Sequence, residues 1–447
     1  MNKMVERILF SPLGDTDPIR GCHDGAMLHI LRHYRPTRVV LFYTYDMAEK
    51  ERRDHRYTRA IKHVAPDCIV EEQYTDIQDA HLYETFSKIL PQEVLRLREE
   101  HPTCELLLNL SSGTPQMKTV LSIMAAHTSG CRAVQVPMPE GKSNRSNEAT
   151  KDTDNIDVLI ETNIDDEEDA KNRCVEPPLY VFHFYEERSR ILSLIDSYEY
   201  AAALKVARGS VLIPQEATSL LQYAERRSML LTEEAKKVLR EYDGKKLFPF
   251  TGKTEALVEY FLIMQIDQET GRLSNLMLRM IPFLYEFLRE YVVQNVKISI
   301  HTLCERRKNA PWLVREKLEK QEKELLKHLD RVFTGGYKDQ ALSFYILYHC
   351  CSYAGKTGRT GDSVRHAGMM AELEQIKEVR NLRNETAHEM VNVTEKRFHE
   401  AVGIGSQEAM GCFCRMLVLI YGDKVRTMRS IYRDLNAWVE QALEVHA

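Results

Sequence analysis

Arg383, Asn384 and His388 place a side chain that can hold a phosphate close to one that can transfer a proton. The planar guanidinium group of arginine matches phosphate oxygens, and histidine changes its charge near neutral pH. Together they could cleave a phosphodiester without a metal ion. On one α-helix, side chains five residues apart point about 140° away from each other. The spacing therefore favours a site that is completed across a dimer.

Spacing alone does not select this segment, because three other arginine–histidine pairs are similar: Arg56 and His63, Arg96 and His101, and Arg359 and His366. The first two lie in charged stretches typical of solvated helices. The third straddles a glycine-rich stretch, which we expect to be a mobile loop. Only the Arg383 pair has asparagine directly after the arginine and alanine directly before the histidine.

A second segment runs from an apolar stretch, Leu106–Leu108, through Asn109 into the small-residue turn 111–114 and then into a helix. Backbone N–H groups and hydroxyls at a helix N-terminus favour phosphate or another polar ligand. Another polar loop, residues 11–15, follows the first predicted strand. Ligands of parallel sheets bind beyond the carboxyl ends of the strands, so we expect the two loops to converge on one pocket.

The elements that position these segments differ between the two halves of the chain. Five apolar runs alternate with helical segments in the first 140 residues, which predicts a doubly wound, Rossmann-like α/β domain. The predicted strands are Ile8–Phe10, Val39–Tyr43, Cys68–Val70, Leu106–Leu108 and Ala133–Val136. From about residue 180, apolar residues recur at helical spacing and predict an all-α domain. We place the domains at 1–175 and 176–447, with the acidic stretch near 140–175 as a solvated linker or insertion.

Composition restricts the class of protein. The 447 residues carry a net charge of −5, which argues against a protein that coats nucleic acid nonspecifically. No apolar run approaches the ~20 residues that span a bilayer, so we expect no membrane and a cytoplasmic location. The ten cysteines include no C-x-x-C pair, so the sequence predicts neither a zinc site nor a disulfide framework.

Nucleotide-dependent enzymes are the main rival class. Two stretches, 252–254 and 355–357, spell the Gly-Lys-Thr end of a phosphate-binding loop. Leu247 and Cys350 stand where that loop requires an earlier glycine. No G-x-G-x-x-G follows the first predicted strand, which argues against a Rossmann-type dehydrogenase.

The Arg383–His388 segment resembles the R-N-x-x-A-H signature of HEPN ribonucleases, and the Leu106–Thr119 segment resembles the ligand loop of CARF domains. Together the two halves resemble the CARF-HEPN ribonucleases that accompany the Csm effector complex of type III CRISPR systems. This resemblance spans most of the chain. It implies a CARF sensor domain followed by a HEPN ribonuclease domain.

The resemblance also implies an activity. It implies a homodimeric, metal-independent endoribonuclease that cuts single-stranded RNA by 2′-hydroxyl attack, leaving a cyclic phosphate and a 5′-hydroxyl. Arg383, Asn384 and His388 would be catalytic. The activator would be a cyclic oligoadenylate made by the effector complex, hexa-adenylate being favoured over tetra-adenylate, and no cofactor is implied. Its expected contacts are Ser11, Asp15, Asn109, Ser111, Ser112, Gly113, Thr114 and Gln116.

Two further possibilities accompany this interpretation. Some CARF domains of the resembling family cut their own activator, and Thr114 could align that reaction. The alternative from another class is a nonenzymatic CARF sensor that signals through dimerisation or partner recruitment. The intact arginine, asparagine and histidine favour the enzyme.

A metal-free mechanism makes a direct prediction for chelation. EDTA should leave the rate of activated RNA cleavage unchanged, because no cluster of His, Cys or carboxylates in the sequence has metal-ligand spacing. Initial rates with a labelled single-stranded RNA, with and without EDTA, measure this. Inhibition by EDTA that a divalent ion reverses would contradict the mechanism.

Overall fold

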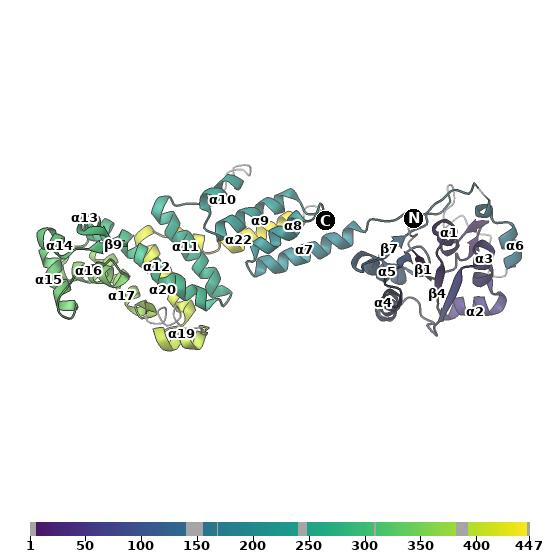
Figure 1. Ribbon diagram of the computed structural model, residues 1–447, viewed down its shortest axis with the longest axis horizontal. Helices are drawn as coiled ribbons and strands as arrows, with labels where there is room; N and C mark the ends of the chain where they lie inside the picture. Colours follow the sequence, from purple (N-terminus) through teal and green to yellow (C-terminus); the bar gives the residue numbers. More distant parts are fainter. Residues whose placement is uncertain are drawn as a thin grey trace. The chain divides into compact units, whose positions relative to one another are not determined.

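The computed structural model describes residues 6–139, 155–167, 169–239, 248–307, 310–380 and 392–444. The chain divides into two compact units, Met1–Glu186 and Glu187–Ala447. Figure 1 shows an α/β unit followed by a largely helical unit. The expected α/β domain followed by a helical domain is confirmed.

The first unit is built on one parallel sheet of five strands in the order β5-β4-β1-β6-β7. The strands are β1 (Arg7–Pro12), β4 (Arg38–Tyr43), β5 (Ile69–Tyr74), β6 (Glu105–Asn109) and β7 (Cys131–Val134). Each contains or overlaps one of the five apolar runs of the sequence. The runs of β1, β4 and β6 are continuous because strands buried on both faces need apolar residues at every position, whereas the edge strand β5 is partly exposed and largely polar.

Successive side chains of the strands enter two different cores. In β1, Leu9 packs into one core, whereas Ile8 and Phe10 pack into the other. The first core is covered by α1 (Ala26–Tyr34), α2 (Tyr45–Asp54), α3 (Arg56–Val64) and α6 (Ile156–Glu161). The second is covered by α4 (Tyr83–Glu100) and α5 (Pro115–His127). Helices on both faces make the sheet doubly wound.

Three small elements complete this unit: the hairpin of β2 (Ile19–Arg20) with β3 (His23–Asp24), and the 3₁₀ turn η1 (Ile164–Asp166). Ile156 and Leu159 of α6 are buried in the first core, and Asp165 of η1 is buried as well. The interpretation of residues 140–175 as solvated is therefore wrong for these residues, because Ile156 and Leu159 pack into the core and Asp165 pairs with Arg173. Other described residues of the stretch, such as Glu161 and Glu167, are exposed. Helix α7 (Tyr180–Asp196) runs across the boundary between the units.

The second unit begins with α8 (Tyr200–Arg208), α9 (Gln215–Ser228), α10 (Thr232–Leu239), α11 (Gly252–Glu269) and α12 (Leu273–Tyr291). There follow the π-helical turn η2 (Val292–Val296), α13 (Ile300–Leu303), α14 (Arg315–Gln321), α15 (Lys323–Val332), α16 (Phe344–Thr357) and α17 (Ser363–Ile376). The last helices are α19 (Glu395–Val402), α20 (Ser406–Tyr421), α21 (Lys424–Met428) and α22 (Ile431–Glu444). Phe283 of α12 contacts Phe287 and Phe413 in the buried centre, as the helical apolar spacing predicts.

The helical unit also contains a small antiparallel sheet that the sequence analysis did not expect. Its strands are β8 (Cys304–Arg307), β9 (Ala310–Leu313) and β10 (Gln340–Ala341). Segments this short carry too few residues for a period of two to stand out from helical spacing. The prediction of a mobile loop around Gly355 is wrong up to Thr357, because α16 continues through that residue.

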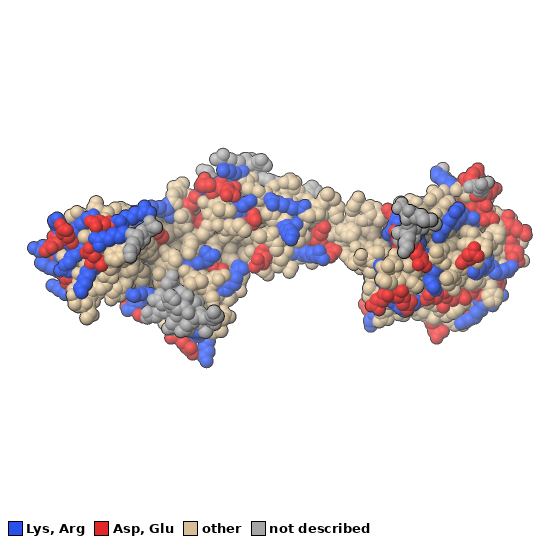
Figure 2. Space-filling model, viewed as in Figure 1, with Lys and Arg blue, Asp and Glu red and all other residues tan. Residues whose placement is uncertain are grey.

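The surface of neither unit is uniformly basic. Figure 2 shows lysine and arginine interspersed with aspartate and glutamate on the face in view of each unit. This mixture agrees with the net charge of −5. Among the helices that the structure describes, none combines the length and apolar character needed to cross a membrane.

A buried ion pair joins α9 to α11 in the helical unit. Arg227 is fully buried and donates two hydrogen bonds to Glu259, at 2.8 and 2.6 Å. The guanidinium group also lies 4.5 Å from the ring centroid of Phe248 and donates to the hydroxyl of Tyr223. Burial raises the pKa of Glu259, and Arg227 opposes this shift. Each of the two buried charges is therefore stabilised only by the presence of the other.

Replacing one partner of this pair should destabilise the helical unit strongly. Arg227→Met leaves Glu259 buried without its counter-charge and should cost about 3–5 kcal/mol, whereas Arg227→Met with Glu259→Leu should recover most of that loss. Both tryptophans, Trp312 and Trp438, lie in this unit, so their fluorescence during urea unfolding reports its stability. As a control, Arg433→Gln, which breaks an exposed pair, should cost under about 1 kcal/mol. Equal losses in the free energy of unfolding for Arg227→Met and Arg433→Gln would contradict this account.

Candidate functional site

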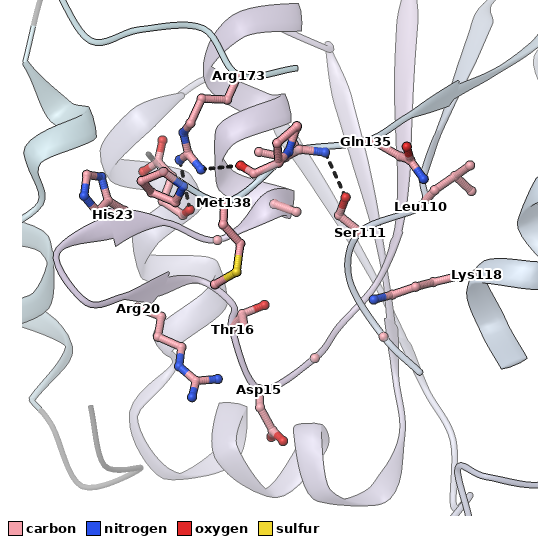
Figure 3. Close-up of a pocket in the computed structure, with 18 residues that line it drawn as sticks. Asp15, Thr16, Arg20, His23, Leu110, Ser111, Lys118, Gln135, Met138 and Arg173 are labelled. Atoms are coloured by element: carbon pink, nitrogen blue, oxygen red, sulfur yellow. Dashed lines mark hydrogen bonds between the residues drawn. The ribbon is translucent and has the colours of Figure 1, made fainter. Parts of the chain in front are cut away.

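The strand order creates a crevice at one edge of the first unit. The chain leaves β1 to pair β4 on one side and later returns to place β6 on the other side. At such a switch point the loops after the two strands separate and leave room for a ligand. A cavity of about 590 Å³ occupies this position, and Figure 3 shows side chains from several elements around it.

The loops after β1 and β6 meet at two glycines. A Cβ atom on Gly14 would lie 2.9 Å from the backbone nitrogen of Gly113, which is closer than real side chains come. Gly113 also has a φ of 78°, a left-handed conformation that favours glycine. A side chain at either position would push the loops apart. The expected convergence of the two loops is thus confirmed.

Asn109, the last residue of β6, organises both loops from beneath the crevice. Its Nδ2 donates to Ser11 Oγ and to Ser112 Oγ, both at 2.9 Å. Its Oδ1 accepts from the backbone nitrogens of Ser111 at 2.9 Å and Ser112 at 3.3 Å. All four hydrogen-bonding capacities of one carboxamide are therefore used on β1 and on the turn after β6.

The residues chosen from the sequence fall into three groups. Asp15, Ser111 and Gly113 line the crevice. Ser11, Asn109 and Ser112 are buried behind it and are not lining residues. Thr114 and Gln116 lie at the start of α5, outside the lining; their Oγ1 and Oε1 atoms are buried without a hydrogen-bond partner among the described residues.

Cationic side chains that the sequence analysis did not select also line the crevice. They are Arg20 from β2, Lys118 from α5 and Arg173 from the segment after η1, with His23 beside them. Burial lowers the pKa of Lys118, while Asp17 acts in the opposite direction. Only Lys118 adjoins the small-residue turn in sequence, so it alone could have been found from the motif. Three positive groups converging on one crevice suit an anionic ligand.

Acidic residues near the crevice are held by arginines. Asp24, His29 and Asp165 bring their possible ligand atoms within 4.8 Å of one another. However, Asp24 accepts from Arg32 Nε at 2.9 Å, and Asp165 accepts from Arg173 at 2.6 Å. These contacts make the group an ion-pair network that anchors η1 against β3. The carboxylates of Asp24 and Asp165 thus already accept hydrogen bonds from arginines and are not free to bind a metal ion.

The expected catalytic residues, Arg383, Asn384 and His388, lie outside the described residues. The helices on either side of them in sequence are α17 and α19. Helix α17 packs along α20, and Glu372 of α17 accepts two hydrogen bonds from Arg415 of α20, at 2.7 and 2.9 Å.

Three family models match the chain in succession. The Cas_Csm6 CARF domain matches residues 67–174, the CRISPR-associated protein Csm6 6H domain residues 182–228, and the Cas_Csm6 HEPN domain residues 246–440. The 6H match covers α7 to α9, which the sequence analysis did not separate from the rest of the helical region.

Curated relatives with similar sequences are named CRISPR system endoribonuclease Csm6. The protein from Mycobacterium tuberculosis is 36% identical over 225 residues, spanning 50% of this chain and about half of the relative, 54%. The protein from Enterococcus italicus is 26% identical over 421 residues, 86% of this chain and 88% of the relative.

The fold agrees with a solved structure as well. Enterococcus italicus Csm6 bound to cyclic hexa-2′-fluoro-hexa-dAMP matches with a TM-score of 0.67 and 21% identity, covering 98% of this chain and 100% of that chain. These similarities agree with the observed fold, a parallel sheet with its crevice followed by a helical unit, and with the three successive family matches. The chain belongs to the Csm6 family of CRISPR-associated proteins.

Proposed function

We propose that this chain is an endoribonuclease that a cyclic oligoadenylate activates. The observation that carries the proposal is the crevice lined by Arg20, Lys118 and Arg173, in a chain that also matches the HEPN domain model. The curated relatives named endoribonucleases and the solved relative bound to a cyclic nucleotide support it. A cyclic oligoadenylate is a polyanion, and the crevice offers it cations and polar loop atoms.

The activator lies on the first unit in this proposal. Lys118, Arg20 and Arg173 bind its phosphates, while Ser111, Gly113 and Asp15 contact it from the two loops. Asn109, Ser11 and Ser112 position those loops. Thr114 and Gln116, which lie outside the lining, contact the activator only when the start of α5 reorients. If this domain also cleaves its activator, Thr114 would align that reaction; its Oγ1 has no hydrogen-bond partner among the described residues.

Symmetry supports the assembly, and the ligand of a solved relative supports the ring size. A cyclic hexa-adenylate has even-fold symmetry and suits two identical crevices, so a homodimer would bind one ring. The ligand of the solved relative is a six-membered ring analogue, which favours hexa-adenylate over tetra-adenylate. The effector complex of a type III CRISPR system would supply the activator.

Cleavage takes place on the helical unit. His388 transfers the proton, Arg383 stabilises the charge on the phosphorane, and Asn384 orients the substrate or the histidine. The 2′-hydroxyl of the RNA attacks the adjacent phosphate, which forms a cyclic phosphate and expels the 5′-hydroxyl of the next nucleotide. No metal ion is required for this sequence of steps.

The catalytic assignment predicts that His388→Ala and Arg383→Ala each lower activated RNA cleavage by about 10²-fold or more. Binding of cyclic hexa-adenylate should stay near wild type, because its contacts lie in the other unit. A fluorescent single-stranded RNA measures cleavage, and calorimetry measures activator binding. Wild-type cleavage by either variant would contradict the assignment. Activator binding with no RNA cleavage by the unmodified chain would favour the nonenzymatic sensor.

Lys118→Met should weaken binding of cyclic hexa-adenylate by about 10- to 100-fold, because it removes one charge-assisted hydrogen bond while keeping the apolar stem. Maximal RNA cleavage should return when the activator concentration is raised. The measurement is an activation curve for each protein. Lys88→Met, which removes an exposed lysine on α4, is the matched control and should not shift the curve. An unshifted curve for Lys118→Met would remove this lysine from the activator site.

A further inference from the structure

A row of aromatic side chains follows α15 and α16 in the helical unit. It consists of Phe333, Tyr345, His349, His328 and Tyr353, and is called the aromatic row below. Successive ring centroids are 5.6, 4.4, 6.1 and 5.7 Å apart. All five residues are partly buried, and the Nε2 atoms of His328 and His349 are themselves buried. Figure 1 shows α16 between α15 and α17, so the row lies beside the helix that precedes the Arg383 motif.

The rings of the aromatic row pack mainly edge to face or tilted. Phe333 and Tyr345 meet at 85°, and Tyr345 and His349 meet at 82°. In such edge-to-face contacts each pair covers one face at most. A row of partly exposed rings at this spacing is how proteins stack the bases of single-stranded nucleic acids without reading their sequence.

The two histidines of the row act as neutral rings in a positive environment. Burial lowers the pKa of His349 to about 4, with further lowering by His328 and Lys356. Burial also lowers the pKa of His328, together with Lys356 and Arg331. Both imidazoles are therefore uncharged at neutral pH, and the nearby charges that perturb them are cations. Flat neutral rings flanked by cations complement bases and phosphates.

Arg380 connects the aromatic row to the motif. Its guanidinium carbon lies 5.2 Å from the ring centroid of Tyr345. Its side chain is exposed. Arg380 precedes Arg383 by three residues, so their Cα atoms are at most about 11 Å apart. Arg380 therefore joins the aromatic row to the segment of the chain that leads into the Arg383 motif.

We propose that the aromatic row binds single-stranded RNA, with bases stacking on its partly exposed rings and on the guanidinium plane of Arg380. The inference rests on the proposed ribonuclease function and assigns its substrate-binding surface. A second copy of the chain fits less well. In a two-fold contact through this surface, the cations beside the row would face their own copies, whereas RNA phosphates neutralise them.

The test compares Tyr345→Ala with Tyr345→Phe in the full-length chain with saturating cyclic hexa-adenylate. Binding of a fluorescein-labelled single-stranded RNA is measured by anisotropy in the His388→Ala background, and KM and kcat are measured with His388 intact. Stacking of one base predicts that Tyr345→Ala raises the dissociation constant and KM by about 5- to 100-fold, with a smaller change in kcat. Tyr345→Phe keeps the ring and should behave as wild type.

Tyr285→Ala is the matched control. Tyr285 is also half-buried and has an arginine, Arg289, at 5.8 Å from its ring centroid. It lies outside the aromatic row, so its loss should leave RNA affinity unchanged. Sedimentation of each variant reports its oligomeric state.

Three outcomes would overturn the inference. The first is wild-type KM and RNA affinity for Tyr345→Ala. The second is an equal loss for Tyr285→Ala, and the third is a Tyr345→Ala protein that loses affinity only because its dimer dissociates. In each of these the unmodified chain still cleaves RNA. An unmodified chain that cleaves no RNA with activator would instead refute the proposed function.

Discussion

The crevice of the first unit depends on the carboxamide of Asn109. One buried side chain bonds to Ser11 at the end of β1 and to Ser112 and the backbone of the turn after β6. A buried amide that loses its partners costs free energy, so these bonds act together to keep both loops in place. The close contact of Gly14 with Gly113 follows from that placement. Polar atoms beneath the crevice thus determine its width.

The charged side chains around the crevice are also held in place by buried hydrogen-bond partners. Arg173 lines the crevice and donates to Asp165 and to the backbone oxygen of Pro137. Asp165 in turn accepts from the backbone nitrogen of Asp24 at 2.8 Å. A ligand that approaches Arg173 therefore meets a cation whose position an acidic partner already fixes. Orientation of this kind reduces the entropy lost on binding.

Much of the fold could be predicted because its signals are local. The strands β1, β4 and β6 are continuous apolar runs, and Gly113 stands in a visible turn. Arg20 and Arg173 could not be predicted as crevice residues. Arg20 lies in a two-residue strand, and the segment of Arg173 reaches the sheet through a single bridge between Gln135 and Val175. Such contacts depend on distant residues and leave no periodic pattern.

The buried pair of Arg227 and Glu259 has a consequence for the evolution of the helical unit. Arg227 belongs to the segment matched as a 6H domain, and Glu259 to the segment matched as a HEPN domain. A recombination event that exchanged one segment for an unrelated helical partner would leave an unneutralised charge in the new protein's interior. The two segments are therefore expected to be inherited together. Recombination at the boundary between the two segments is therefore expected to be rare.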